Sequence, residues 1–253
     1  MSTALAAIRR STAPIRREIG ETFSPRSQTD GVLPPLMLLL TVLTGIVDAL
    51  AYLKLGHVFV ANMTGNVVFL GFAAAGAGGL SVPGSLLALA CFFPGGVAAG
   101  RLASRLGGNR LQQLRAATAA QALLCVAAIP VAAIAGHDLG PGSRYTLIVL
   151  LALAMGVQNA TARRLAVPDL TTTVLTQTLT GIAADSRLGG GSGANTARRV
   201  LSVTTMLLGA IVGALVLLRV APVAAVAVAA AILAFVAGAA HRASQRERIS
   251  AQT

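Results

Sequence analysis

The sequence has few charged and few aromatic side chains. Charged residues make up 11% of its 253 positions, aromatic residues make up 4%, and Trp is absent. A water-soluble domain carries roughly a quarter charged residues, so this composition excludes the ordinary soluble enzyme folds. The net charge is +12. We expect anionic lipid and not nucleic acid to meet this charge, because the basic residues lie in tails and short loops between apolar stretches.

Cysteine and histidine are also scarce. Cys91 and Cys125 lie inside apolar stretches, which predicts two small buried side chains and no disulfide. The three His residues have no Cys or carboxylate at ligand spacing. An intramembrane enzyme needs a nucleophile beside a base, a second carboxylate or a metal cluster, and the sequence offers none of these patterns. We therefore expect no metal, no cofactor and no enzymatic activity.

Long apolar runs make up most of the remaining chain, since 55% of its residues are hydrophobic. A run of about 20 apolar residues is long enough for a helix to cross a bilayer. Six stretches reach this length, at 33–53, 82–103, 115–136, 145–163, 199–218 and 221–240. The sequence thus predicts an all-α, polytopic membrane protein with one transmembrane domain over residues 31–240. Residues 1–30 would form a basic, disordered tail and residues 241–253 a second tail.

Two further segments are partly apolar but begin with polar residues. Residues 59–78 open with Asn62, Thr64 and Asn66, and residues 170–185 are rich in Thr. We predict that both enter and leave the membrane on the same side, as short re-entrant helices.

The distribution of positive charge supports this prediction, because cytoplasmic loops hold most of the Lys and Arg in membrane proteins. If neither short segment crosses, all Lys and Arg residues fall on one side of the membrane except Lys54, Arg144 and Arg219. The fold class is therefore six full transmembrane helices plus two short polar-opened helices, with both termini in the cytoplasm.

The chain also contains a weak internal repeat. Three short motifs recur in the same order: residues 45–49 at 156–160, 63–66 at 175–178, and 96–100 at 209–213. The nearly constant offset predicts two repeat halves, over about 33–136 and 145–240. Because each half holds three spans, the second half would lie inverted in the membrane, a common construction in transporters.

Polar residues within the membrane are the candidates for function. Asp48 is foremost, because an ionised carboxylate there costs on the order of several kcal/mol unless it has a partner or water. Two interpretations of Asp48 stay open, a proton-coupling group or a paired residue that pins two helices. In an inverted repeat, the amino-terminal ends of half-helices meet near the midplane and present N–H groups to a polar or anionic solute. The substrate or pathway candidates are Asp48, Asn62, Thr64, Asn66, Gln158, Asn159, Thr173 and Thr176.

The candidate Asn and Thr residues have a second interpretation, which is hydrogen bonding between ordinary packed helices. Close helix packing is also predicted by two Gly-xxx-Gly motifs, formed by Gly96, Gly100, Gly209 and Gly213. The spacing leaves open whether these glycines pack within one chain or across a homo-oligomer.

These motifs resemble those of the YoaK-like family of uncharacterised bacterial integral membrane proteins. The resemblance rests on Thr-Gly-Ile-Val-Asp-Ala at 44–49, Phe-Val-Ala-Asn-Met-Thr-Gly-Asn at 59–66, Met-Gly-Val-Gln-Asn-Ala at 155–160 and Asp-Leu-Thr-Thr-Thr at 169–173. One departure is Gln177, where similar sequences tend to have Gly. The resemblance implies a multi-pass protein of the bacterial inner membrane and supplies no substrate.

Two functions stay open from the sequence. The first is a small-solute transporter or channel, with a small molecule or ion as substrate and with the polar half-helices and Asp48 near its pathway. The alternative is a non-transporting membrane scaffold or accessory subunit, whose polar groups only fix packing and whose basic loops recruit lipid or a partner.

Overall fold

The computed structural model describes residues 31–167, 170, 175–186, 189–191 and 195–250, and the regular structure in these ranges is entirely helical. The helices, in chain order, are α2 (Leu33–Lys54), α3 (Met63–Ala74), α4 (Val82–Arg105), α5 (Arg110–Ala135), α6 (Pro141–Leu165), α7 (Leu175–Ala184), α8 (Thr196–Arg219) and α9 (Pro222–Ser250). All except α3 and α7 are long and apolar enough to cross a membrane. The prediction of a polytopic helical membrane protein with six full spans is confirmed.

The helix ends follow from local sequence signals. Pro occupies the first turn of α2, α4 and α6, where its missing N–H costs nothing. Ser81 caps α4 by accepting from the N–H of Gly84, and Asn109 caps α5 by accepting from the N–H of Gln112. Gly136, with φ of 64°, ends α5. These boundaries lie within about five residues of those expected from the apolar runs.

The last helix differs more from its expected length. α9 continues to Ser250, so the second tail, expected from residue 241, begins inside this helix. The added residues include Ala, Arg, Gln and Glu, which favour helix even where they are not apolar. The apolar run therefore marks the membrane-spanning part of α9 and not the whole helix.

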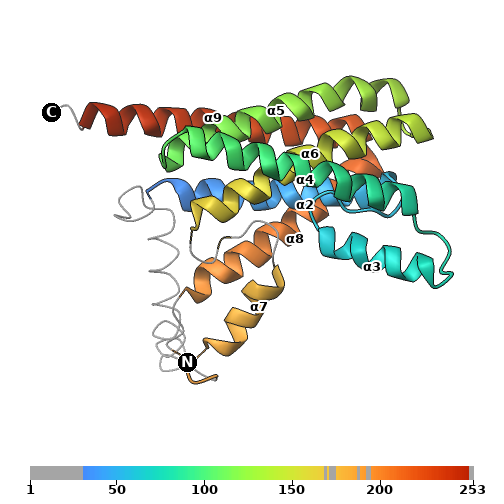
Figure 1. Ribbon diagram of the computed structural model, residues 1–253, viewed down its shortest axis with the longest axis horizontal. Helices are drawn as coiled ribbons and strands as arrows, with labels where there is room; N and C mark the ends of the chain where they lie inside the picture. Colours follow the sequence, from blue (N-terminus) through green and yellow to red (C-terminus); the bar gives the residue numbers. More distant parts are fainter. Residues whose placement is uncertain (1–30, 168–169, 171–174, 187–188, 192–194, 251–253) are drawn as a thin grey trace, which may run out of the picture.

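The two short helices are too short to cross a bilayer alone. α3 has 12 residues and α7 has 10, which correspond to about 18 and 15 Å at the rise of an α-helix. The hydrocarbon core is about 30 Å thick. In Figure 1 both helices start near the middle of the bundle and run outward, α3 toward the start of α4 and α7 toward the start of α8.

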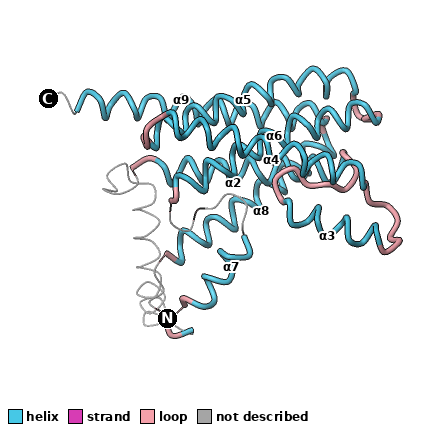
Figure 2. The backbone as a smooth tube through the Cα atoms, in the orientation of Figure 1, coloured by secondary structure: helices cyan, strands magenta, loops and turns pink. Residues whose placement is uncertain are grey.

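The long helices are arranged around α2 and α6, which are the most buried of the spans. The closest pairs are α2 with α8, α4 with α6, and α5 with α9, while α3 packs on α4 and α7 on α8. Each of these contacts has a counterpart when α2, α3, α4 and α5 are exchanged for α6, α7, α8 and α9. In Figure 1 the two members of each exchanged pair also run in opposite directions. Figure 2 shows that most loops lie at the two ends of the bundle.

Glycines allow two pairs of helices to cross backbone against backbone. A Cβ added to Gly45 of α2 would lie 2.4 Å from the carbonyl oxygen of Met206 in α8. A Cβ added to Gly156 of α6 would lie 2.1 Å from the carbonyl oxygen of Phe92 in α4. Because Gly45 and Gly156 occupy the same position in the motifs at 45–49 and 156–160, both halves use the same device at the same place.

The Gly-xxx-Gly motifs fall at these crossings, but only one motif supplies the closest contacts. A Cβ on Gly209 would meet the carbonyl oxygen of Val42 at 2.1 Å, and one on Gly213 would meet Cα of Ile46 at 2.8 Å. Gly96 and Gly100 pack more loosely against α6: a Cβ added to either would find its nearest atom at 3.8 and 3.7 Å, which is ordinary van der Waals contact.

In α4 the closest approach is made by Gly95, at 2.3 Å from the carbonyl oxygen of Leu153. Neighbouring residues of a helix point about 100° apart. A Gly-xxx-Gly motif therefore indicates where two helices cross, but it does not identify which residue faces the neighbouring helix most closely. All of these contacts lie within one chain.

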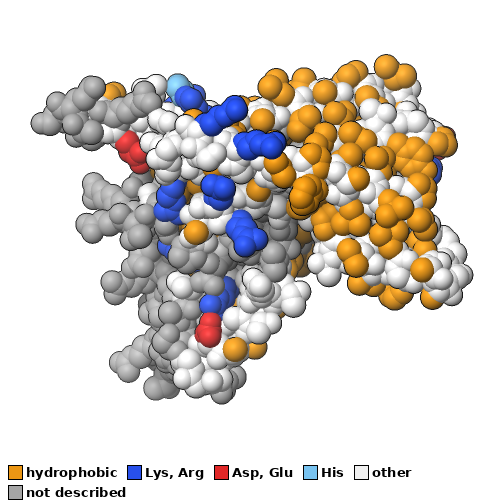
Figure 3. All heavy atoms as spheres, viewed as in Figure 1, with side chains coloured by type: hydrophobic (Ala, Val, Ile, Leu, Met, Phe, Trp, Pro, Cys, Tyr) orange, Lys and Arg blue, Asp and Glu red, His pale blue; other side chains and the backbone are white. Residues whose placement is uncertain are grey.

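Charge separates the two ends of the bundle. We call the end where α4 and α6 finish and α5 begins the basic end; there Arg110 donates to the carbonyl oxygen of Leu165, and Arg115 contacts His241 at 2.9 Å. The opposite end carries Lys54, Arg144 and Arg219. Figure 3 shows Lys and Arg side chains gathered toward one side of the molecule and hydrophobic side chains covering the other.

The sides of the bundle expose large apolar side chains. Phe93 is 74% exposed and Leu123 is 72% exposed. Such exposure is unfavourable in water and favourable against lipid tails. The chain is therefore a multi-pass membrane protein whose long helices contact the bilayer.

Candidate functional site

A cavity of about 530 Å³ lies where the two short helices begin. Its polar lining includes four of the eight residues that the sequence marked as candidates, namely Asn62, Thr64, Asn159 and Thr176. The first two belong to the start of α3, Asn159 belongs to α6, and Thr176 lies in the first turn of α7. Residues from both halves of the chain therefore meet at one place.

The cavity lies about midway between the ends of the bundle. Phe92 of α4 and Met206 of α8 both line it. Each stands at the same position, close to the midpoint, of a helix of 24 residues. Sequence reasoning missed both residues, because an apolar side chain within an apolar run carries no signal of its own.

The starts of α3 and α7 supply backbone polarity to this cavity. The first N–H groups of a helix have no partner within the helix, and they carry the positive end of its dipole. Asn62 stands at the N-cap of α3, where its side chain makes no capping hydrogen bond, and it is exposed. Thr64 and Thr176 are exposed as well. The cavity thus combines amide, hydroxyl and backbone groups that can hydrogen-bond to a guest molecule.

Asp48 lies behind the wall of this cavity and not in it. Its Oδ1 accepts hydrogen bonds from the backbone N–H groups of Val60, at 3.1 Å, and of Ala61, at 2.9 Å. The carboxylate is buried, and Ala61 itself lines the cavity. Asp48 therefore holds the non-helical segment that leads into α3, and the contact joins α2 to this segment and not to a second helix.

Asn66 holds the same segment from the other side. Its Oδ1 accepts from the N–H of Phe59 at 2.8 Å, and its Nδ2 donates to the carbonyl oxygen of Phe59 at 2.6 Å. Asn66 is fully buried, so this candidate acts as a clamp and does not face the cavity. The ring of Phe59 stacks on those of Tyr52 and Phe69, at centroid distances of 5.3 and 5.7 Å.

The two amides of α6 point in different directions. Gln158 donates from Nε2 to Thr44 Oγ1 at 2.7 Å and to the carbonyl oxygen of Leu40 at 3.1 Å, which links α6 to α2. Asn159 lines the cavity and donates to the carbonyl oxygen of Met155 within its own helix, at 3.0 Å. Consecutive helix residues lie about 100° apart, so only one of the pair can face the cavity. The remaining candidate, Thr173, lies outside the described residues.

An ion pair that sequence reasoning did not identify ties the far end of α7 to α8. Arg199 lies 2.7 Å from Asp185 and also donates to the carbonyl oxygen of Gly181. A Cβ on Gly181 would lie 2.7 Å from the guanidinium carbon of Arg199, so glycine makes room for this contact. Both charges are visible in the sequence, but their pairing depends on how α7 folds back.

The described lining of the cavity contains polar groups and no charged side chain. Such a site can bind a small polar molecule by hydrogen bonds, and the two helix starts favour negative charge on it. It offers no nucleophile–base pair for covalent chemistry among the described lining residues.

Comparison with known proteins gives a family without an assigned activity. The sequence profile described as "Protein of unknown function (DUF1275)" matches residues 36–239. The UPF0700 transmembrane protein YoaK of Bacillus subtilis (strain 168) is 36% identical over 151 residues, which cover 59% of this chain and 65% of that relative. The match thus spans just under two thirds of the relative's length. No solved structure matches the chain.

Proposed function

Since this chain belongs to the DUF1275 family, whose description states no activity, we propose a function from the geometry of its site: a small-solute transporter or channel built as an inverted repeat. The observation that carries the proposal is that α3 and α7, one from each half, begin at a single cavity at mid-depth. We propose transport without a catalytic step.

The symmetry of the helix contacts supports the inverted repeat. Every contact between long helices of one half has an equivalent in the other half, and equivalent helices run in opposite directions in Figure 1. Gly45 and Gly156 make equivalent backbone crossings. Transporters of inverted-repeat construction hold their substrates between the halves, where broken or short helices start. The cavity occupies the corresponding place here.

The chemistry of the lining supports a polar solute. Asn62 and Thr64 come from one half, and Asn159 and Thr176 come from the other. A packing role alone would require these side chains to be paired between helices. Asn62, Thr64 and Thr176 are instead exposed to space, which favours a guest molecule that donates to the amides and accepts from the helix starts.

Asp48 would support the pathway indirectly. It holds the backbone of Val60 and Ala61, so it sets where α3 begins and hence the shape of the cavity. A proton-coupling role remains a hypothesis that requires solute flux to be measured. In that case the Asp48→Asn variant would lose the dependence of flux on a pH gradient and keep flux down a solute gradient.

The charge asymmetry suggests the orientation. We propose that the basic end faces the cytoplasm of a bacterial inner membrane, because cytoplasmic loops are enriched in Lys and Arg. The start of α2 and the end of α9 both lie at this end in Figure 1, so both chain termini would be cytoplasmic.

Cysteine labelling tests whether the cavity is an aqueous pathway. Cys91 and Cys125 are both free and would first be replaced by Ala. Single cysteines at Thr64 and Thr176 would then be exposed to a charged, membrane-impermeant methanethiosulfonate in intact cells and in inverted vesicles. We expect both positions to react from the side to which the cavity opens.

Thr178 provides the matched control, because it lies in the same short helix but is buried. A cysteine there should stay unlabelled. If cysteines at Thr64 and Thr176 are equally inert while loop cysteines react, the cavity contains no water and transport is contradicted. That result would favour the scaffold or accessory-subunit hypothesis.

Flux in reconstituted vesicles tests transport itself. The shrinking and re-swelling of proteoliposomes in urea, glycerol, glycine or sodium acetate would be followed by light scattering. We expect at least one of these probes to enter faster than in protein-free vesicles, and modification of a cysteine at Thr64 to slow that entry. Equal rates with and without protein for the whole panel would count against a channel for solutes of this size.

A further inference from the structure

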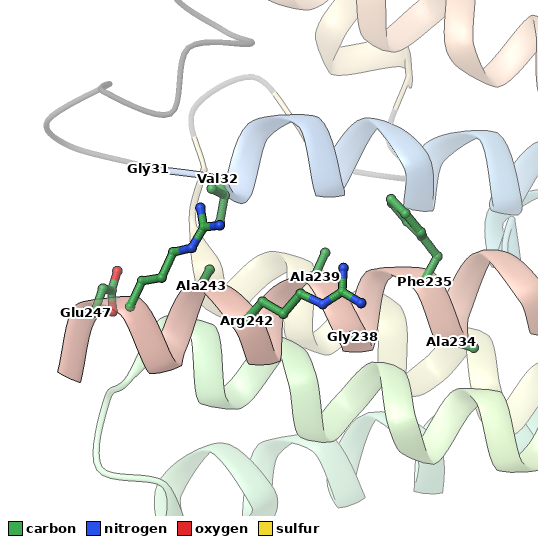
Figure 4. Close-up of a pocket in the computed structure, with 10 residues that line it drawn as sticks. Gly31, Val32, Ala234, Phe235, Gly238, Ala239, Arg242, Ala243 and Glu247 are labelled. Atoms are coloured by element: carbon green, nitrogen blue, oxygen red, sulfur yellow. The ribbon is translucent and has the colours of Figure 1, made fainter. Parts of the chain in front are cut away.

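A second hollow lies at the basic end, far from the mid-depth cavity. This groove, of about 520 Å³, runs between the start of α2 and the last part of α9. Gly31 and Val32 form one side, and α9 forms the other with a stripe from Ala234 to Glu247. Figure 4 shows the groove with Phe235 directed from α9 toward α2.

The stripe along α9 changes character from one end of the groove to the other. Toward the membrane interior it consists of Ala234, Phe235, Gly238 and Ala239, and toward the basic end it presents Arg242 and Arg246. The distance from Phe235 to Arg246 along the helix is about 16 Å at 1.5 Å per residue. The groove is therefore apolar at one end and positively charged at the other.

The two arginines are available to a ligand. They stand one helical turn apart on the same face, both are exposed, and within the described part of the chain neither has a hydrogen-bond or ion-pair partner. Glu247 also lines the groove, so the three side chains together carry one positive charge. In Figure 4 the side chain of Arg242 extends along α9 toward Gly238 and Phe235.

Small residues keep the apolar part open. A Cβ added to Gly238 would have no other atom within 4 Å, and its neighbour Ala239 adds only a methyl group. Phe235 is 64% exposed and bounds the groove at its inner end. This shape suits a flexible hydrocarbon chain, which gains free energy by covering apolar surface.

We propose that this groove binds one anionic phospholipid, with its phosphate between Arg242 and Arg246 and an acyl chain over Gly238 and Ala239. Arginine binds phosphate oxygens through several N–H donors, and anionic headgroups lie at the depth where basic residues of a membrane protein cluster. The proposal does not depend on transport. The first 30 residues of the chain, which carry five arginines, are a poor occupant by charge.

Lipid titration of the detergent-purified protein, followed by native mass spectrometry, tests this site. The probes are phosphatidylglycerol and phosphatidylcholine with identical acyl chains. We expect the double variant Arg242→Gln, Arg246→Gln to weaken binding of phosphatidylglycerol roughly 10- to 30-fold, because each basic residue near a membrane strengthens anionic lipid binding about fivefold. Binding of phosphatidylcholine should change by less than about twofold.

The chain offers a matched control pair in α4. Arg101 and Arg105 have the same spacing, are exposed at the basic end and lie outside the groove. Their replacement by Gln should leave the affinity for phosphatidylglycerol within about twofold. An equal loss in both double variants would overturn the proposal in favour of diffuse attraction to the whole basic end.

A groove-filling variant tests the acyl-chain part separately. Gly238→Leu places a side chain in open space, so it should fold normally while it weakens both lipids. Gly71→Leu on α3, where a Cβ also meets nothing within 4 Å, is its control. If Gly238→Leu binds lipid as well as the wild type does, or if glycerol phosphate without chains displaces the lipid at equal concentration, the groove does not hold a phospholipid.

Discussion

The two halves of this protein share their backbone arrangement but not their polar side chains. Gly45 and Gly156 make the same close crossing in the two halves. Asp48 accepts two backbone hydrogen bonds from the segment before α3, whereas its counterpart in the repeat, Asn159, donates to a carbonyl oxygen of its own helix. The two halves therefore use the same backbone packing at equivalent places and different polar contacts beside it.

Substitutions of the glycines at the helix crossings should destabilise the protein most, and by equal amounts in the two halves. In the variants Gly45→Ala and Gly156→Ala a Cβ would lie within 2.4 Å of a backbone oxygen of the partner helix, and backbone moves less easily than a side chain. We expect each to lower the free energy of unfolding by about 3 kcal/mol or more. Denaturation in detergent, followed by circular dichroism, measures this.

A large loss for one glycine and a negligible loss for the other would break the symmetry. Expression of either protein at wild-type stability would show that the helices can separate at that crossing without cost.

Substitution of Asp48 should give the next largest loss of stability, and substitution of Asn159, at the equivalent position of the other half, should give a smaller one. Asp48→Ala leaves the buried N–H groups of Val60 and Ala61 without an acceptor, which costs about 2–4 kcal/mol in total. The hydrogen bond that Asn159→Ala removes from the carbonyl oxygen of Met155 lies within one helix and is worth about 1 kcal/mol. Thermal unfolding in detergent compares the two.

Asp48→Asn separates the hydrogen bonds from the charge, because the amide keeps one oxygen acceptor. Its stability should fall between those of the wild type and Asp48→Ala. If Asp48→Asn is as unstable as Asp48→Ala, the negative charge and not the hydrogen-bond geometry is what the segment before α3 requires.

Substitution of the buried polar residue in each short helix should give a smaller difference in stability between the halves. Asn66 occupies the place in α3 that Thr178 occupies in α7, and both are buried. Asn66→Ala should cost about 2 kcal/mol, since it removes two hydrogen bonds to Phe59. Thr178→Ala should cost about 1 kcal/mol or less. Hydrogen exchange should show faster opening of the residues before α3 in the first variant.

Replacing Asn66 by the residue of the other half sharpens this contrast. A Thr side chain is too short to bond to both the N–H and the carbonyl oxygen of Phe59, as Asn66 does. The stability of Asn66→Thr should therefore resemble that of Asn66→Ala. A fully stable Asn66→Thr protein would show that the segment before α3 is held without this clamp.

The smallest effect is expected at Gly96, where an added Cβ meets nothing closer than 3.8 Å. Ala favours helix over Gly by about 0.5–1 kcal/mol, so Gly96→Ala should raise the free energy of unfolding slightly. It also serves as the control for Gly45→Ala and Gly156→Ala. A loss of stability at Gly96 would indicate that α4 and α6 approach more closely than the structure indicates.

Much of the fold could be predicted from the sequence because bilayer thickness sets a length that apolar runs either reach or miss. The six spans and the two short helices follow from that single criterion together with the distribution of Lys and Arg. The end of α9 did not follow, because its last turns are polar and helix formation there depends on residue propensity. The recurring glycines marked where helices cross but not which glycine faces the neighbour.

The site was predictable in part for a related reason. Polar residues inside a membrane are rare enough to be noticed, and Asn62, Thr64, Asn159 and Thr176 do meet at one cavity. Their sequence did not show that Asn66 and Gln158 turn away to bond with Phe59 and Leu40. Side-chain direction depends on helix rotation, which short motifs do not determine. The apolar walls gave no signal at all.

Cross-linking tests most directly whether the two short helices share one cavity. Cysteines at Thr64 and Thr176, in a chain without Cys91 and Cys125, would be treated in membranes with a bifunctional maleimide about 10 Å long, and the intramolecular product identified by mass spectrometry. The shared cavity predicts efficient cross-linking of this pair, and little for the control pair Thr64 and Thr180, which lies one turn farther along α7. Absence of the first product, or equal yields from both pairs, would contradict a common cavity.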